Sequence, residues 1–253
     1  MFEPVKIAPS ILSADFMHLG RDIELIEKAG AGYVHVDVMD GHFVPNLTMG
    51  VPVVKQLKKA TSLPLDVHLM IANPLEQLPW FLDAGADSVT VHAEALDADG
   101  LARAVAAIHA AGAKAAVSVK PRTAVGALAP VLADLDMVLV MSVNPGFSGQ
   151  KFIPQSFDKI RATRAMLNAA GAGDVLIQVD GGIGEVTAPI VAAAGADVLV
   201  CGNAVFAAED PAAALAAVQA AAEEARLAAI KADMDEADIA AIMDEVARLR
   251  ALQ

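Results

Sequence analysis

The stretch Ala84-Gly85-Ala86-Asp87-Ser88-Val89-Thr90-Val91-His92 is one copy of a repeated join between a helix and a strand. Its glycine stands where a helix should stop, since glycine readily takes the left-handed conformation of a helix end. The valine-rich run behind it predicts a buried strand. Because similar joins recur along the chain, the sequence predicts repeated βα units and a parallel sheet. The related quartets are Ala29-Gly30-Ala31-Gly32, Ala111-Gly112-Ala113-Lys114 and Ala194-Gly195-Ala196-Asp197.

Short runs rich in valine, isoleucine and leucine alternate with longer alanine-rich segments, and we count eight such units. This internal repeat favours the α/β class and a closed (β/α)8 TIM barrel. A doubly wound open sheet is the alternative, but no Gly-x-Gly-x-x-Gly turn follows the first expected strand. Asn73-Pro74 and Asp210-Pro211 are expected helix starts. The expected strands are residues 5–8, 33–38, 65–70, 88–92, 114–119, 137–141, 175–180 and 197–201.

The composition is that of a globular protein, with 253 residues of which 56% are hydrophobic. No apolar run reaches the ~18 residues that a membrane span needs, and the first residues lack the features of a signal peptide. We therefore expect a cytoplasmic protein. The formal charge of −13 argues against general affinity for nucleic acid or anionic membranes, so an anionic substrate needs a local trap. The single cysteine, Cys201, excludes an intrachain disulfide and is expected to be buried in a strand.

Polar side chains with metal-binding chemistry fall near the carboxyl ends of the expected strands. Strand alternation places His35 and Asp37 on one face of the second strand, and His68 and Asp180 follow on the third and seventh. Burying such groups without partners costs several kcal/mol, and chemistry in a barrel sits at this rim. The four residues therefore predict one metal site. Imidazole and carboxylate ligands suit Zn²⁺, Fe²⁺, Mn²⁺ or Co²⁺.

Glycine-rich turns follow the sixth, seventh and eighth expected strands. They are Asn144–Gly149, Gly181-Gly182 and Gly202-Asn203, the last opening a short helix. Small residues let backbone N–H groups approach an anion, and barrels often bind phosphate in this quadrant. The sequence thus predicts a phosphate trap that needs no lysine or arginine.

Five segments resemble the ribulose-phosphate 3-epimerase family, and the resemblance covers about residues 5–225. It implies a metal-dependent enzyme that interconverts D-ribulose 5-phosphate and D-xylulose 5-phosphate in the pentose phosphate pathway or in carbon fixation. A phosphorylated ketopentose is then the substrate, and the protein is expected to be a homo-oligomer. The segments are residues 8–16, 35–46, 66–70, 140–147 and 179–183.

The resemblance also implies roles for single residues. His35, Asp37, His68 and Asp180 match the family's ligands for one divalent ion per subunit, and Asp37 and Asp180 match its acid/base pair. Epimerisation removes the C3 proton and returns a proton to the opposite face, so a carboxylate is needed on each side. In the ribulose-to-xylulose direction Asp37 is expected to accept the proton and Asp180 to donate one.

Other positions match the family's contacts with the sugar and the phosphate. The family often has glycine where Ser148 stands and serine or threonine where Asn203 stands. His92 and Glu94 lie near the same rim but are not expected to be ligands. The expected substrate-binding residues are Ser10, Met39, His68, Met70, Met141, Gly146, Phe147, Ser148, Gly149, Gly181, Gly182, Gly202 and Asn203.

The resemblance fades beyond about residue 225, which divides the chain into a catalytic barrel (1–225) and an acidic helical extension (226–253). From Asp233 onwards, apolar residues recur at spacings of three and four, which predicts one more amphipathic helix. It either packs on the barrel or contributes to an oligomer contact.

Two other functions remain open at this point. One is an epimerase for a six-carbon substrate such as D-allulose 6-phosphate. The other is a non-catalytic barrel that binds sugar phosphates, which the presence of both Asp37 and Asp180 disfavours.

Overall fold

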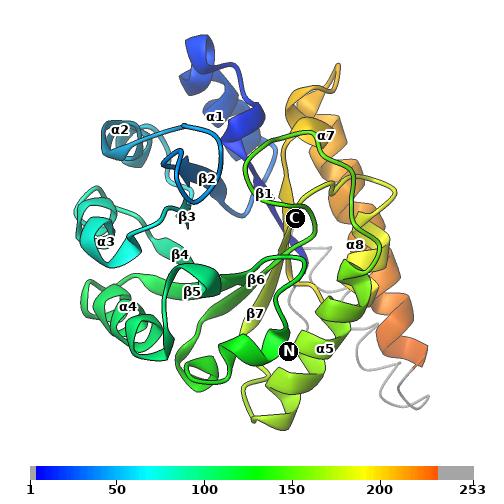
Figure 1. Cartoon of the computed structure of the whole chain (residues 1–253). Helices are drawn as coiled ribbons and strands as arrows, with labels where there is room; N and C mark the ends of the chain where they lie inside the picture. The colour runs from blue at the N-terminus through cyan, green and yellow to red at the C-terminus, as the bar shows by residue number, and fades with distance from the viewer. Residues whose placement is uncertain (1–3, 233–253) are drawn as a thin grey trace.

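The computed structural model describes residues 4–232, and a barrel of eight parallel strands forms its centre (Figure 1). Every expected strand is present, and no strand end is shifted by more than one residue. The order β1-β8-β7-β6-β5-β4-β3-β2 follows the chain around the barrel, which confirms the predicted TIM barrel. The strands are β1 (Lys6–Pro9), β2 (Val34–Met39), β3 (Leu65–Met70), β4 (Ser88–His92), β5 (Lys114–Val119), β6 (Met137–Met141), β7 (Leu176–Asp180) and β8 (Val198–Cys201).

The seam between β1 and β2 closes the barrel. The Gly32 N–H donates to the Ile7 carbonyl (2.8 Å), and a single parallel bridge joins Ser10 to His35. The barrel is therefore closed at the rim that carries the polar residues, where Ser10 is brought next to β2.

The helices form the outer layer around the strands (Figure 1). Gly30, Gly85, Gly112 and Gly195 have positive φ and stand at the predicted helix ends. Asn73 occupies an N-cap position without a capping bond, because its side chain bonds Glu76 and Gln77 instead. The helices are α1 (Leu19–Lys28), α2 (Val51–Ala60), α3 (Pro74–Leu82), α4 (Ala98–Ala110), α5 (Ser156–Ala169), α6 (Ala188–Ala193), α7 (Asn203–Phe206) and α8 (Pro211–Ala232).

One of the eight expected crossover helices is replaced by two short 3₁₀ turns. Between β5 and β6 the described chain forms only Val125–Leu128 and Leu132–Asp134. Pro121, Gly126 and Pro130 lie in this segment, and residues of these types interrupt a helix. The expectation of a full helix here was wrong.

Side-chain alternation separates an apolar outer layer from a polar inner one. Val34, Val36 and Val38 of β2 are buried against the helices, whereas His35 and Asp37 face the lumen. Ala8, Ala116, Met137, Val198 and Val200 form a separate apolar cluster.

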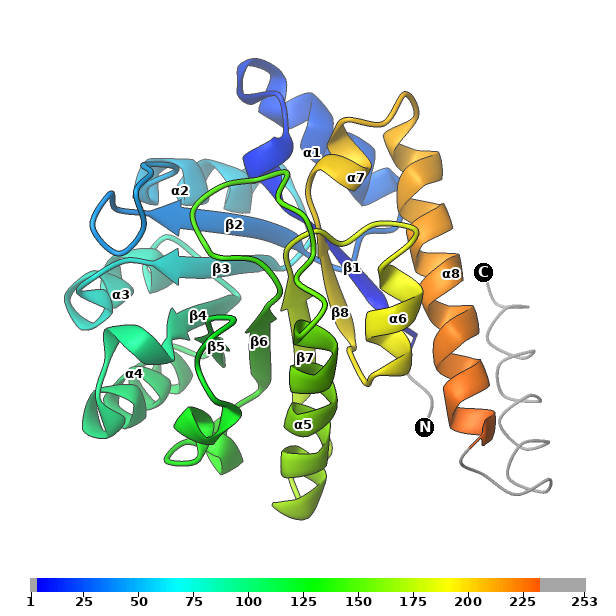
Figure 2. The same ribbon diagram turned by 45° about the vertical axis from the view of Figure 1, so that its right-hand side comes forward.

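The last described helix, α8, packs along α6 (Figure 2). It passes residue 225 without interruption, and the amphipathic helix expected from Asp233 onwards lies outside the described residues. Cys201 is fully buried in β8, as predicted. Within residues 4–232, no helix has the length and apolar character that crossing a membrane requires.

Candidate active site

Four side chains from three strands converge at the carboxyl-terminal rim. The strand register pairs Asp37 of β2 with His68 of β3, while His35 lies two residues earlier on the same face and Asp180 ends β7. One ligand-type atom from each of these four residues lies within 4.8 Å of all the others. The structure therefore brings together the whole set that the sequence predicted.

Two imidazole nitrogens in this cluster have no hydrogen-bond partner. Nε2 of His35 and Nδ1 of His68 are both buried and unpartnered, lying 3.4 and 3.3 Å from Oδ1 of Asp37. Nδ1 of His68 is also 3.8 Å from Oδ2 of Asp180. Buried polar atoms are almost always satisfied. Two nitrogens and two carboxylates facing one point are the donor set that a divalent transition metal takes.

His35 is held in place by a carboxylate that the sequence analysis did not assign to the site. Its Nδ1 lies 2.7 Å from Oδ2 of Asp66, which also accepts from Nε2 of Gln178 (2.6 Å). All three side chains are fully buried. Each added residue lies two positions before a predicted ligand, Asp66 before His68 and Gln178 before Asp180. That spacing of two was the signal that could have found them.

His68 is held by a second histidine. Its Nε2 lies 2.9 Å from Nε2 of His92, and Nδ1 of His92 lies 3.1 Å from Oε2 of Glu94. His92 is fully buried at the end of β4. Burial lowers the pKa of His92 to about 4, although Glu94 opposes this change. His92 is therefore a neutral imidazole at pH 7.

The pKa values of the two carboxylates in the cluster are shifted in opposite directions. Burial raises the pKa of Asp180 to about 6, and the nearby charge of Asp37 raises it further, against the opposing effect of the two histidines. Burial also works to raise the pKa of Asp37, but the nearby charges of His35 and His68 outweigh it and hold this pKa well below its usual value. A pair of titratable groups with separated pKa values is the pattern of an acid and a base.

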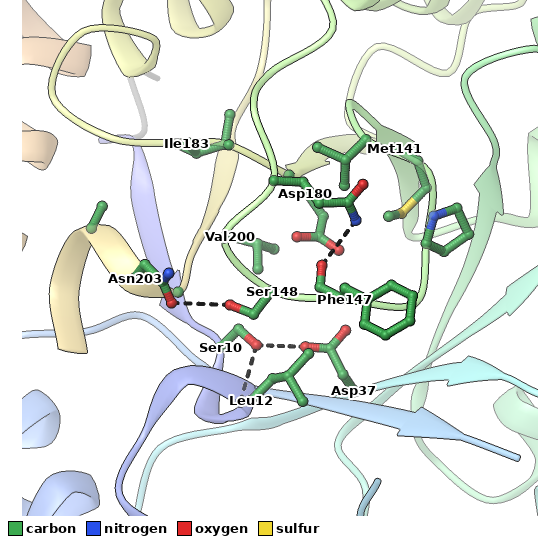
Figure 3. A pocket seen from close by; sticks show the side chains of 18 of the residues that line it. Ser10, Leu12, Asp37, Met141, Phe147, Ser148, Asp180, Ile183, Val200 and Asn203 are labelled. Carbon is green, nitrogen blue, oxygen red and sulfur yellow. Dashed lines mark hydrogen bonds between the residues drawn. The ribbon is translucent and has the colours of Figure 1, made fainter. Parts of the chain in front are cut away.

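A cavity of about 370 Å³ opens beside these carboxylates. Figure 3 shows Ser10, Asp37 and Asp180 facing it, with Oγ of Ser10 donating to Oδ2 of Asp37 (2.5 Å). Met39, Met70 and Met141 line it and are buried, as the sequence analysis expected. The wall next to the carboxylates is thus soft and apolar.

The opposite wall consists of glycine-rich main chain. Gly181 and Gly182 have positive φ, and a Cβ on Gly182 would lie 2.4 Å from the backbone nitrogen of Phe152. The N–H groups of Asn203 and Ala204, at the start of α7, have no partner among the described residues. The described residues that line the cavity include no lysine or arginine. Such a wall offers an anion backbone donors and a helix start.

Ser148 and Asn203, the two departures from the family pattern, contact one another. Oγ of Ser148 donates to Oδ1 of Asn203 (3.1 Å), as Figure 3 shows, and lies 2.5 Å from Oγ of Ser13. The loop after β6 is thereby tied to the loops after β1 and β8.

The predicted substrate-binding residues all line the cavity except His68, which is fully buried behind Asp37. The cavity also has lining residues that the sequence analysis did not assign. They include Leu12, Val143, Gln150, Ile183, Glu185, Thr187 and Val200.

The amino-acid sequence matches a known protein family. Residues 6–206 match the model of the ribulose-phosphate 3 epimerase family. Ribulose-phosphate 3-epimerase of Bacillus subtilis is 49% identical over 215 residues, which cover 85% of this chain and 98% of the relative. The enzyme of that name from Mycobacterium tuberculosis (strain H37Rv) is 51% identical and covers 84% of this chain, with 91% of its own length matched.

A solved structure supports the fold. The 3-hexulose-6-phosphate synthase of Salmonella typhimurium superposes with a TM-score of 0.63 at 21% identity, covering 87% of this chain and 99% of its own. At this identity the likeness is evidence for the barrel alone.

Proposed function

Because the chain belongs to the ribulose-phosphate 3-epimerase family, we propose that it interconverts D-ribulose 5-phosphate and D-xylulose 5-phosphate by proton transfer at C3. The observation that carries this proposal is the pair Asp37 and Asp180, which face one cavity from different strands. A single base would return the proton to the face from which it came, whereas two carboxylates allow inversion.

In the ribulose-to-xylulose direction one carboxylate accepts a proton and the other donates one. Asp37, whose pKa is held low, is ionised and accepts the C3 proton. Asp180 is the group that donates a proton to the opposite face, and burial raises its pKa to about 6 in the metal-free protein. The Ser10 hydroxyl orients the Asp37 carboxylate through its hydrogen bond. In the reverse direction the two roles exchange.

We propose that His35, Asp37, His68 and Asp180 hold one divalent ion, Zn²⁺, Fe²⁺, Mn²⁺ or Co²⁺. The unpartnered nitrogens of the two histidines support this assignment. A divalent ion held by these four residues would supply positive charge that stabilises the negative charge developing on the substrate when C3 loses its proton.

The remaining cavity walls bind and shield the substrate. The glycine-rich turns after β6, β7 and β8 offer backbone N–H groups to the phosphate, with Ser148 and Asn203 at their edge. Met39, Met70 and Met141 exclude water from the enediolate. This assignment makes the phosphate site independent of lysine and arginine.

The family resemblance also supports wider proposals. The enzyme acts in the cytoplasm, in the pentose phosphate pathway or carbon fixation, and assembles as a homo-oligomer. Residues 1–225 form the catalytic barrel and residues 226–253 an acidic extension.

Turnover on matched substrates tests this function. The metal-supplemented protein is incubated with D-ribulose 5-phosphate or D-allulose 6-phosphate, and the ketose products are resolved by ¹³C NMR. We expect D-xylulose 5-phosphate from the five-carbon substrate at a rate at least about tenfold higher than any six-carbon epimerisation. Faster conversion of the six-carbon substrate would assign a different substrate, and binding without conversion of either would make the barrel a binding protein.

A further inference from the structure

The two histidines of the proposed metal centre have different supports. His35 contacts a carboxylate directly, through Asp66. His68 contacts another imidazole, and a carboxylate appears only one step further, at Glu94. A chain of two histidines and one glutamate needs its protons in a definite order, and that order decides whether His68 can bind a cation.

The order follows from the atoms that meet. Nε2 of His68 and Nε2 of His92 are 2.9 Å apart, so one of them carries a proton and the other offers a lone pair. An ionised carboxylate accepts only, so Nδ1 of His92 carries a proton and donates to Glu94. When both rings are neutral, the lone pair of His92 is then on Nε2. Nε2 of His68 must therefore be the donor, which leaves the lone pair of His68 on Nδ1.

Nδ1 of His68 is the unpartnered nitrogen that faces Asp37. Glu94 thus determines which atom donates and which accepts in each hydrogen bond from Glu94 through His92 to His68. Its side chain is nevertheless 21% exposed and lies outside the cavity lining. We propose that Glu94 and His92 are positioning residues that fix the tautomer of His68 and so aim its Nδ1 lone pair at the metal centre. This inference rests on the metal site of the proposed function.

Neighbouring residues hold the Glu94 carboxylate in position. The other carboxylate oxygen of Glu94 accepts from the backbone N–H of Lys120 (2.7 Å) and from the hydroxyl of Thr123. Nζ of Lys159 donates to the carbonyls of Lys120, Pro121 and Thr123, which fixes this turn.

The His92 ring is enclosed on two sides. Its centroid lies 5.0 Å from that of His68, with an angle of 26° between the ring planes, and 4.8 Å from that of Phe43. Neither the carboxylate of Glu94 nor the ring of His92 is therefore free to reorient.

Replacement of Glu94 by glutamine exchanges the donor and acceptor roles in the hydrogen bonds that link residue 94, His92 and His68. Glutamine has nearly the same shape as glutamate, so the side-chain positions need not change. The amide oxygen must face the Lys120 N–H, because that group only donates. The amide NH₂ then faces Nδ1 of His92, which has to become an acceptor. His92 shifts its proton to Nε2 and donates to His68, and His68 is left with its proton on Nδ1. A protonated Nδ1 cannot bind a metal ion.

The experiment compares the full chain with Glu94→Gln and Thr123→Val. Long-range ¹H–¹⁵N spectra of the metal-free proteins, recorded at a pH where both rings are neutral, report the tautomers of His68 and His92. Competition with a fluorescent chelator measures Zn²⁺ affinity. Thr123→Val is the matched control because it removes a hydrogen bond to Glu94 but leaves the carboxylate facing His92.

We expect the Nε2–H tautomer of His68 in the wild type and in Thr123→Val, and the Nδ1–H tautomer in Glu94→Gln. Zn²⁺ affinity should fall about 10- to 100-fold in Glu94→Gln, the usual cost of losing such a supporting contact. It should stay within about threefold of wild type in Thr123→Val. Melting temperatures verify that all three proteins are folded.

An Nδ1–H tautomer of His68 in the wild type would overturn the proposal, as would unchanged tautomers and Zn²⁺ affinity in Glu94→Gln. A wild type that binds no Zn²⁺, Fe²⁺, Mn²⁺ or Co²⁺ would contradict the metal site of the proposed function instead. The tautomers would still test the order of protons in the chain, so the two failures are distinguishable.

Discussion

The two walls of the cavity are built from opposite materials. Towards β2 and β3, buried ionisable side chains meet one another, and His35, Asp37 and His68 are 0 to 4% exposed. Towards β6, β7 and β8, the cavity wall is rich in glycines and their backbone N–H groups, and the small polar side chains of Ser148 and Asn203 lie beside them. The side chains of the first wall can gain or lose protons, whereas the backbone N–H groups of the second wall are fixed dipoles.

The difference shows how an acidic chain can bind a dianion. With a formal charge of −13 and no lysine or arginine among the described cavity residues, the protein relies on N–H groups that cannot titrate. The ionisable side chains of His35, Asp37, His68 and Asp180 are assigned instead to the proton and the cation. The two walls should therefore respond differently to mutation, pH and salt.

The largest effect is expected from removing either of the two cavity carboxylates, Asp37 or Asp180. Asp37→Asn and Asp180→Asn should each lower kcat by about 10²- to 10⁴-fold, the range typical of general acid–base groups. Asp180→Asn should still exchange the C3 proton of D-ribulose 5-phosphate with solvent, because Asp37 remains on that face. Steady-state assays and NMR of the recovered substrate measure the two effects.

Both residues are also proposed ligands, so the metal content of each variant has to be measured alongside. Turnover near that of the wild type in either metal-loaded variant would refute the two-base scheme.

A smaller effect is expected in the main-chain wall. A Cβ on Gly202 would lie 2.5 Å from Oγ of Ser13 and 3.4 Å from Oγ of Ser148, at the expected phosphate position. Gly202→Ala should raise KM about tenfold, comparable with the loss of one hydrogen bond to a charged group, with a smaller change in kcat. Gly20→Ala is the control, since its Cβ meets nothing within 4 Å. Equal KM values for both variants would place the phosphate elsewhere.

The charged wall should bind its metal more tightly as the pH rises. Burial lowers the pKa of His35, but Asp37 and Asp66 outweigh it and raise the pKa well above the usual value. The metal-free protein therefore holds a proton on His35 at pH 7, and a cation must displace it. Below this pKa, Zn²⁺ affinity should rise by about tenfold per pH unit. Chelator competition from pH 6 to 8 measures it, and an affinity independent of pH would show that His35 is already neutral.

The smallest effect is expected from salt. A phosphate held by lysine or arginine binds more weakly as ionic strength rises. Here salt mainly screens the repulsion between the acidic protein and its substrate, so KM should fall or stay constant, by no more than about twofold between 0.05 and 0.2 M salt. A clear rise in KM would reveal a cationic residue at the phosphate.

The barrel was predictable because its signals are local. Valine-rich runs and the Ala-Gly-Ala joins set each strand within one residue, and strand alternation placed the four ligand candidates on one rim. The segment between β5 and β6 was mispredicted because alanine and leucine masked the effect of Pro121, Gly126 and Pro130.

The outer contacts of the site were not predictable in the same way. Gln178 and Asp66 lie 112 residues apart and meet across the barrel lumen, and no sequence pattern specifies such a pairing. His92 and Glu94 were recognised as rim residues, but their connection to His68 depends on ring orientations. Local periodicity thus revealed which residues share a rim, whereas packing decides which atoms meet.

Proton exchange at C3 tests the central claim most directly. D-Ribulose 5-phosphate is incubated in D₂O with metal-loaded and with chelator-treated protein, and deuterium at C3 is followed by NMR and mass spectrometry. The account predicts deuterium at C3 of the D-xylulose 5-phosphate formed, and only with the metal-loaded protein. Product without deuterium, or equal labelling after metal removal, would contradict it.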